Sequence, residues 1–156
     1  MTALTPPNIT ASQEDYLEAI WQIVEDKQAV RAKDISARLG VRGASVTGAL
    51  HTLGEKGLVN YAPYDVITLT PRGRAAARDV VRRHEALRDF FVKILKIDPE
   101  TAEDAACRME HAMPPIVLER MARYVKQVEG QSKRGRRASK AARPQTKRST
   151  EHPSDG

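Results

Sequence analysis

The sequence predicts a mainly α-helical protein with a small β-wing, in which a winged helix-turn-helix domain is followed by a second, helical domain. Two short helical patterns flank the tight turn Gly40-Val41, as in a helix-turn-helix. Two short β-prone runs follow at the spacing of a hairpin. Aromatic residues make up only 4% of the chain, so Leu, Ile, Val and Ala must form most of the core, which favours helices over a large sheet.

Caps and spacing predict the elements of the first domain. Thr10 and Gln13 form a capping box that opens the first helix. Gly40 can end the second helix because glycine accepts the left-handed conformation. Thr70 caps the helix after the hairpin, and Pro71 takes its first position, where a missing N–H costs nothing. We expect helices at residues 10–25, 32–39 and 44–56, and strands within residues 57–61 and 66–69.

Prolines divide the second half of the chain. The helix that begins at Pro71 can continue to about residue 95, and Asp98-Pro99-Glu100 restarts a helix that Pro114-Pro115 interrupts. A last helix is expected at residues 116–128. Beyond it the chain is rich in Lys, Arg, Ser, Ala and Pro without an apolar period. The expected parts are a disordered lead-in at residues 1–9, the winged helix-turn-helix domain at 10–75, the helical domain at 76–129 and a disordered basic tail at 130–156.

Charge is segregated along the chain. The net charge of +6 equals that of residues 131–156 alone, which carry eight basic and two acidic side chains. Residues 31–83 also carry a net charge of +6, whereas residues 1–30 and 84–130 carry −4 and −2. A basic middle between acidic segments indicates a nucleic-acid surface beside a cation-binding or dimerising region. A solvated surface without function would show the same pattern.

The third helix is the candidate recognition helix, because the N-terminal part of that helix meets base edges in the major groove. Its expected exposed residues are Arg42, Ala44, Ser45, Thr47 and Gly48. The Arg42 guanidinium can bind a guanine or a phosphate, the two hydroxyls can bind either, and the Ala44 methyl can contact a thymine methyl. A winged helix can also serve protein interaction, but the local positive charge favours double-stranded DNA.

Several side chains suit a transition-metal site. Cys107, Glu110 and His111 lie at i, i+3 and i+4, on one face of a helix. A thiolate, a carboxylate and an imidazole form a ligand set for iron, zinc, cobalt or nickel. Asp15 and Glu18 form a second pair on the first helix. Taken singly, each residue has a simpler interpretation, such as a packed cysteine or a solvated acid.

Three runs carry a family resemblance: Glu14-Asp15-Tyr16-Leu17-Glu18-Ala19-Ile20, Arg83-His84-Glu85 and Ala106-Cys107-Arg108-Met109-Glu110-His111-Ala112-Met113. Together they resemble the diphtheria toxin repressor family, which includes iron- and manganese-dependent regulators. The likeness extends over roughly residues 10–128, with the helix-turn-helix and the wing in the right places. It implies a homodimer whose second domain, from about residue 84, both dimerises and holds the metal.

The resemblance also implies roles for individual residues. Asp15, Cys107, Glu110 and His111 would share one metal site, and His84, with Glu18, would serve another. The family's iron-dependent members place a cysteine at the position of Cys107, whereas its manganese-dependent members place an aspartate at that of Asp15. We expect Fe(II) to be favoured over Mn(II), because a soft thiolate disfavours manganese. The SH3-like third domain of some members is expected to be absent.

The expected function is a metal-dependent repressor of metal-uptake or metal-homeostasis genes, bound to operator DNA when metal is plentiful. A single cysteine and the lack of a signal-peptide or membrane-spanning run indicate a cytoplasmic protein with no membrane partner. Neither an enzyme activity nor a small-molecule substrate is expected, since no His-Glu-x-x-His signature is present. Two alternatives remain: a metal-independent winged-helix regulator, and an architectural DNA-binding protein that uses its basic tail.

Overall fold

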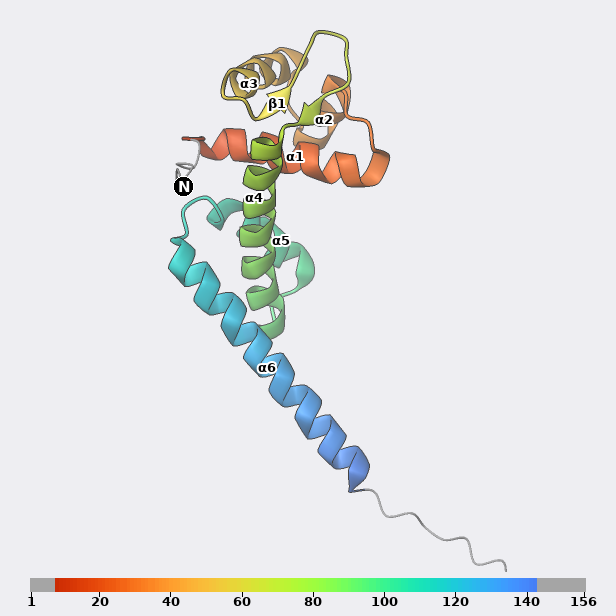
Figure 1. Cartoon of the computed structure of the whole chain (residues 1–156). Coiled ribbons are helices and arrows are strands. Elements are labelled where there is room, and N and C mark those ends of the chain that lie inside the picture. The colour runs from red at the N-terminus through yellow and green to blue at the C-terminus, as the bar shows by residue number, and fades with distance from the viewer. Residues whose placement is uncertain (1–7, 143–156) are drawn as a thin grey trace, which may run out of the picture.

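The computed structural model of the chain describes residues 8–142 (Figure 1). Its elements in order are α1 (Ala11–Lys27), α2 (Ala32–Leu39), α3 (Gly43–Glu55), β1 (Val59–Asn60), β2 (Thr68–Leu69), α4 (Pro71–Asp89), the π-helical segment η1 (Phe90–Ile94), α5 (Pro99–Met109) and α6 (Pro115–Ala141). The predicted fold class, mainly α with a small β-wing, is confirmed. Within residues 8–142, no helix is both long and apolar enough to cross a membrane.

The first three helices and the wing enclose one core. The strands are antiparallel, with Val59 opposite Leu69, and an isolated bridge joins Val30 to Ile67. The fully buried side chains of this core include Leu17, Ile20, Ile35, Val46, Leu50, Leu53 and Leu58. Because the apolar face of α3 is held in this core, its opposite face is left to solvent.

Local signals fix the helix ends close to their predicted positions. The capping box at Thr10 is confirmed, since its Oγ1 accepts from the Gln13 N–H at 3.2 Å and the Gln13 side chain accepts from the Thr10 N–H at 3.1 Å. Gly40 ends α2 with a φ of 64°. Thr70 caps α4, and its Oγ1 accepts from the Gly73 N–H at 3.0 Å. A side chain at Gly73 would collide with the Leu58 carbonyl, so the start of α4 lies directly against the backbone just before β1.

Helix α4 connects the two domains, as Figure 1 shows. Its N-terminal half packs on α1, and Ala77 is fully buried in the first core. Its C-terminal half packs on α5 and α6, where Leu87 lies with Phe91, Ala102, Ala106 and Leu118 in a second core. Helix α5 ends at Met109, earlier than the predicted residue 113. Glu110 is therefore the C-cap of α5, although the sequence pattern placed it within the helix.

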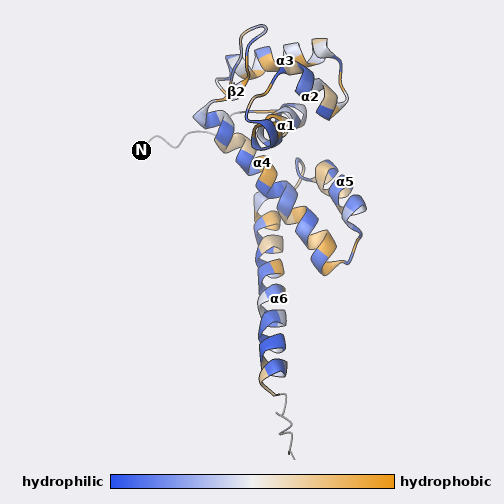
Figure 2. Cartoon of the chain, turned by 90° about the vertical axis from the view of Figure 1, so that its right-hand side faces the viewer, coloured by the Kyte–Doolittle hydropathy of each residue, from blue (hydrophilic) through white to orange (hydrophobic). Residues whose placement is uncertain are grey.

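The expectation of a disordered tail from residue 130 is wrong for residues 130–141, because α6 runs through to Ala141. These residues are exposed, so packing does not order them. Lys, Arg, Gln and Ala are good helix formers, and extending a helix that is already nucleated costs little. Figure 2 shows hydrophilic residues prevailing in this part of α6. The rest of the predicted tail, residues 143–156, lies outside the described residues.

The predicted lead-in is also partly described. Residues 1–7 lie outside the described residues, whereas Asn8 and Ile9 precede α1 and contact the first domain. The Asn8 carbonyl accepts a hydrogen bond of 2.6 Å from Lys56 Nζ, and Ile9 packs against the first core. The C-terminal end of the predicted lead-in is therefore hydrogen-bonded, through Asn8, to Lys56, the C-cap of α3.

Candidate functional site

All six predicted metal ligands come together where α1, α4 and the end of α5 meet. Asp15 and Glu18 project from α1, one helical turn apart, and His84 projects from α4. Cys107 lies in the last turn of α5, and Glu110 and His111 follow at its end. The fully buried Ala102 and Ala106 allow α5 to pack closely on α4.

One group of ligands, here called the outer cluster, consists of Asp15, Cys107 and Glu110. One donor atom from each lies within 4.8 Å of the others. Cys107 is exposed, Asp15 half-buried and Glu110 fully buried. His111 lies at the edge of this cluster, with its Nε2 2.8 Å from Asp15 Oδ1 and 3.4 Å from Glu110 Oε1. The outer cluster is therefore open to solvent on one side, which gives an ion a path to it.

A second group, the inner cluster, consists of Glu18, His84 and Glu110, whose donor atoms also lie within 4.8 Å of one another. All three residues are buried. His84 Nδ1 is 2.7 Å from Glu110 Oε2 and 4.0 Å from Glu18 Oε1. Glu110 belongs to both clusters: its Oε2 lies beside His84, and its Oε1 is the oxygen 3.4 Å from His111 Nε2.

The Glu110 carboxylate supports a cation site. Its Oε2 shares a hydrogen bond with His84, but its Oε1 is buried and has no hydrogen-bond partner. A buried carboxylate oxygen without a partner is costly, and native structures normally satisfy such atoms. Carboxylate, imidazole and thiol donors surround this oxygen, a combination that binds divalent transition metals. The residues present therefore fit a metal ion.

The close packing of these groups changes their proton affinities. Burial and the neighbouring Glu110 raise the pKa of Glu18 to about 7. The hydrogen bond to Glu110, against the opposing effect of burial, raises the pKa of His84 to about 9. Burial and the charge of Glu110 raise the pKa of the Cys107 thiol to about 11. At neutral pH the thiol and the His84 ring hold protons, which must leave before those atoms bind a cation.

Sequence reasoning missed two carboxylates that hold the histidine rings. Glu103 Oε1 is 2.7 Å from His84 Nε2, and Glu14 Oε2 is 2.6 Å from His111 Nδ1. Glu103 could have been found, because it lies four residues before Cys107 on the same face of α5. Carboxylates in such positions orient imidazole ligands and set which nitrogen is free.

Arg83 is a further participant, to which the sequence analysis gave no role although it lies in one of the runs that carry the resemblance. Its Nη2 pairs with Glu14 Oε1 at 2.9 Å, and its Nη1 donates to the Glu110 backbone carbonyl at 3.1 Å. A single guanidinium thus links α1 of the first domain to the end of α5. The predicted ligands are therefore held in a network that joins the two domains.

The candidate recognition surface is on α3. The five residues predicted to face DNA, Arg42, Ala44, Ser45, Thr47 and Gly48, are all exposed, whereas Val46 and Leu50 are buried. Arg42 is the N-cap of α3, so these residues occupy its N-terminal half. The Thr47 hydroxyl donates to the Gly43 carbonyl at 3.1 Å. Helix α3 and the β1–β2 loop lie at the end of the molecule away from α6 (Figure 1).

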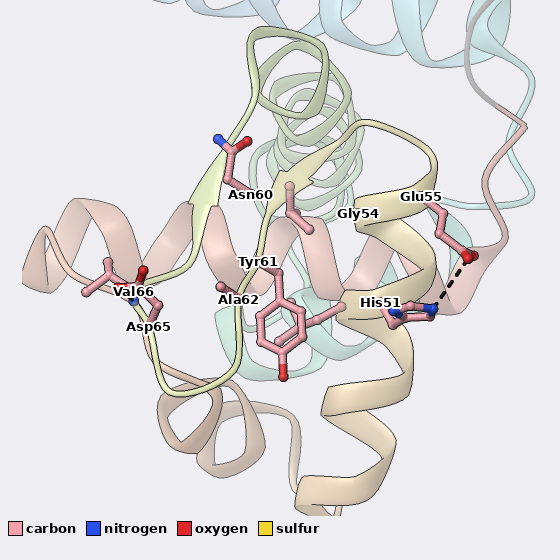
Figure 3. A pocket seen from close by; sticks show the side chains of 10 residues that line it. His51, Gly54, Glu55, Asn60, Tyr61, Ala62, Asp65 and Val66 are labelled. Carbon is pink, nitrogen blue, oxygen red and sulfur yellow. Dashed lines mark hydrogen bonds and ion pairs between the residues drawn. The ribbon is translucent and has the colours of Figure 1, made fainter.

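A hollow of about 600 Å³ separates α3 from the wing (Figure 3). His51 and Glu55 border it on α3 and form an ion pair of 3.3 Å. Asn60, Tyr61 and Asp65 border it on the side of the wing. The hollow therefore belongs to the recognition end of the first domain and is separate from the two clusters of metal ligands.

Two family models match the chain in succession. Residues 8–67 match the iron-dependent repressor N-terminal DNA-binding domain, and residues 70–136 match the iron-dependent repressor metal-binding and dimerisation domain. The second match ends beyond residue 129, where the sequence analysis placed the end of the helical domain. The two matches together extend over most of the described residues.

Similar proteins include an HTH-type transcriptional regulator of Methanocaldococcus jannaschii, 34% identical over 72% of this chain and 91% of its own length. The regulator MntR of Lysinibacillus sphaericus is 32% identical over 77% of this chain and 86% of its own length. A solved manganese-dependent transcriptional repressor in complex with manganese has a TM-score of 0.68 and 32% identity over 73% of this chain. T. acidophilum IdeR has a TM-score of 0.66 and 26% identity over 75% of this chain. The chain spans 52% and 54% of those two solved chains.

Proposed function

The chain belongs to the iron-dependent repressor family of metal-dependent DNA-binding regulators, and we propose that it is a homodimeric repressor whose specific binding to operator DNA requires a divalent transition metal. One observation carries this proposal. Glu110 is fully buried, one of its carboxylate oxygens accepts no hydrogen bond, and it lies where candidate ligands from both domains converge. We expect the repressor to act in the cytoplasm on genes of metal uptake or homeostasis.

Residues of both clusters would hold the metal. Asp15, Cys107, Glu110 and His111 would serve one site, and Glu18, His84 and Glu110 would serve another. A bound divalent cation would supply positive charge that offsets the crowded carboxylates and links α1 to α4 and α5. Asp15 and Glu18 would then join the first domain to the second through the metal, because they are the ligands that α1 contributes.

Metal binding by Asp15 and Glu18 would affect the DNA-binding surface through the core of the first domain. Helix α1 packs against both α2 and α3, so its position relative to α4 sets the position of the recognition helix. In a homodimer, two recognition helices must fit half-sites one helical turn of DNA apart, or a multiple of it. Fixing α1 against the second domain would set this spacing. The residues that would then contact DNA are Arg42, Ala44, Ser45, Thr47 and Gly48.

We further propose that Fe(II) is preferred over Mn(II). The support is chemical: Cys107 places a sulfur donor in the outer cluster, and sulfur ligands favour iron over manganese. Asp15, an oxygen donor in the same cluster, suits either ion. Similar proteins include a manganese-dependent repressor, so the preference of this chain rests on the thiol alone.

The experiment that tests the function measures binding to a pool of genomic DNA fragments, first with a chelator and then with Fe(II), Mn(II) and Zn(II) in turn. Metal should select a small set of fragments that the chelator releases. Glu110→Gln keeps the shape of the side chain but removes its charge, and it should abolish the metal response. Glu119→Gln changes an exposed glutamate on α6 and is the matched control.

Each outcome of this experiment has a clear meaning. Selection of the same fragments with and without metal would identify a metal-independent regulator. Binding without any sequence preference, weakened steeply by salt, would identify an architectural DNA-binding protein. A full metal response in Glu110→Gln would show that the metal binds elsewhere.

A further inference from the structure

The tip of the wing is a tight turn formed by residues 62–65. The Asp65 N–H donates to the Ala62 carbonyl at 3.1 Å, which closes the turn. Pro63 takes the second position, and Tyr64 takes the third with a φ of 65°. A proline followed by a residue of positive φ is the pattern of a type II turn, in which glycine or asparagine normally occupies the third position. Here a tyrosine occupies it.

Tyr64 is costly to the folded chain at this position. A non-glycine residue at positive φ is unfavourable, and such strain persists mainly at functional sites. No packing within the described chain offsets it, because Tyr64 is 101% exposed. The hydrogen bond from the Asp65 N–H to the Ala62 carbonyl spans Tyr64 and keeps it in this conformation. An aromatic ring held away from its own protein in this way suits contact with another molecule.

The position of the tip favours DNA as that molecule. The β1–β2 loop lies at the same end of the molecule as α3 (Figure 1). The hollow between α3 and the wing is lined by His51, Asn60 and Tyr61 among others (Figure 3). With α3 in a major groove, the wing tip, at the same end of the molecule, would meet the adjacent minor groove.

The composition of the wing shows which kind of contact it can make. Residues 60–69 contain neither Lys nor Arg, and they contain one acid, Asp65. This wing is therefore unsuited to binding phosphates through charge. An aromatic ring beside Pro63 resembles instead the apolar side chains that enter minor grooves and contact sugars and base edges there.

We propose that Tyr64 enters the minor groove beside the site of the recognition helix and makes an apolar, shape-dependent contact with the operator. This inference rests on the proposed DNA-binding function and adds a specificity-determining residue to it. The wing then contributes to affinity without adding to the salt dependence of binding. Operators with a minor groove of suitable width at that position would be preferred.

The test compares Tyr64→Asn, Tyr64→Gly and Tyr64→Phe in the full-length, metal-loaded protein. Asparagine and glycine accept positive φ, so both variants should have a Tm equal to or above that of the wild type. Their affinity for operator DNA should nevertheless fall about tenfold, which corresponds to the loss of one buried apolar side chain. Tyr64→Phe keeps the ring and should bind nearly as well as the wild type. The salt slope should stay unchanged in all three.

A matched control is Arg42→Ala on α3, which should lower both the affinity and the salt slope, because it removes a cation from the DNA surface. Hydroxyl-radical footprints should show protection of minor-groove sugars beside the α3 site, lost in Tyr64→Asn. Wild-type affinity and an unchanged footprint in Tyr64→Asn and Tyr64→Gly would overturn this inference and leave the proposed function standing. Failure of the wild type to select any operator would overturn both.

Discussion

Glu110 is a buried side chain that two clusters of candidate metal ligands share. Its two carboxylate oxygens lie near different histidines, His84 and His111, and its backbone carbonyl accepts from Arg83. The neighbouring His84 ring, with a pKa raised to about 9, is positively charged at neutral pH and partly offsets the surrounding acids. Protons are thus bound to atoms that would have to bind the cation, so metal binding releases protons.

This exchange predicts that metal affinity rises with pH. His84, Glu18 and the Cys107 thiol all have a raised pKa, at about 9, 7 and 11, so each holds a proton below that pH. Binding a cation must displace these protons, which becomes easier as the pH rises from about 6 to 9. Calorimetry in buffers of different ionisation enthalpy counts the protons released. Cys107→Ser should release about one proton fewer at pH 7. An equal count in both proteins would show that the thiol is not a ligand.

Cys107 should also set the choice of metal. In Cys107→Glu the outer cluster contains only oxygen and nitrogen donors, which suit Mn(II) better than a thiol does. We expect the half-activating concentration of Mn(II), divided by that of Fe(II), to fall about tenfold, which corresponds to about 1.4 kcal/mol. Operator binding under anaerobic metal titration measures this ratio. An unchanged ratio would show that the exposed Cys107 thiol is not a ligand.

At the scale of elements, α6 departs furthest from its sequence pattern. Its apolar residues stop near Val128, yet the helix continues to Ala141. Its end carries five exposed basic residues: Lys133, Arg134, Arg136, Arg137 and Lys140. A helix of 27 residues is about 40 Å long, and α6 points away from α3 (Figure 1). Within one subunit its basic end is therefore beyond the screening length from the recognition surface.

Deleting residues 131–156 should leave the specificity of the protein unchanged. All predicted metal ligands and the exposed face of α3 lie before residue 112. A basic segment that contacts only phosphates contributes equally to every DNA sequence. Any affinity lost on deletion should therefore be lost by the same factor from operator and random DNA, with a lower salt slope and the same metal response. A selective loss on the operator would mean that the segment takes part in sequence readout.

At the scale of the whole molecule, the sequence predicted the elements better than it predicted the contacts between them. Caps such as Thr10 and Thr70 and the Gly40 turn are local signals, so the helix boundaries they set were close to those observed. The six candidate ligands were assembled from helical spacing together with the family resemblance. The resemblance predicted two sites, but the sharing of Glu110 between them depends on how α1, α4 and α5 pack, which no local pattern records.

The missed residues share the same cause. Glu14, Arg83 and Glu103 matter through their distances to side chains up to 97 positions away in sequence. Charged residues at these positions look like ordinary solvated surface in the sequence. The strain at Tyr64 was likewise hidden, because it is the conformation of the backbone that makes this tyrosine unusual.

We propose that metal and operator DNA bind the same arrangement of the protein, in which α1 is held against α4 and α5. Thermodynamic linkage then requires that each ligand strengthen the binding of the other by the same factor, typically about 5- to 150-fold. The direct measurement is the Kd of the metal with and without saturating operator DNA, set beside the Kd of the operator with and without metal. We expect operator DNA to lower the metal Kd by the same factor, well above one, by which metal lowers the operator Kd. A metal Kd that operator DNA leaves unchanged would contradict the coupling of metal and operator binding.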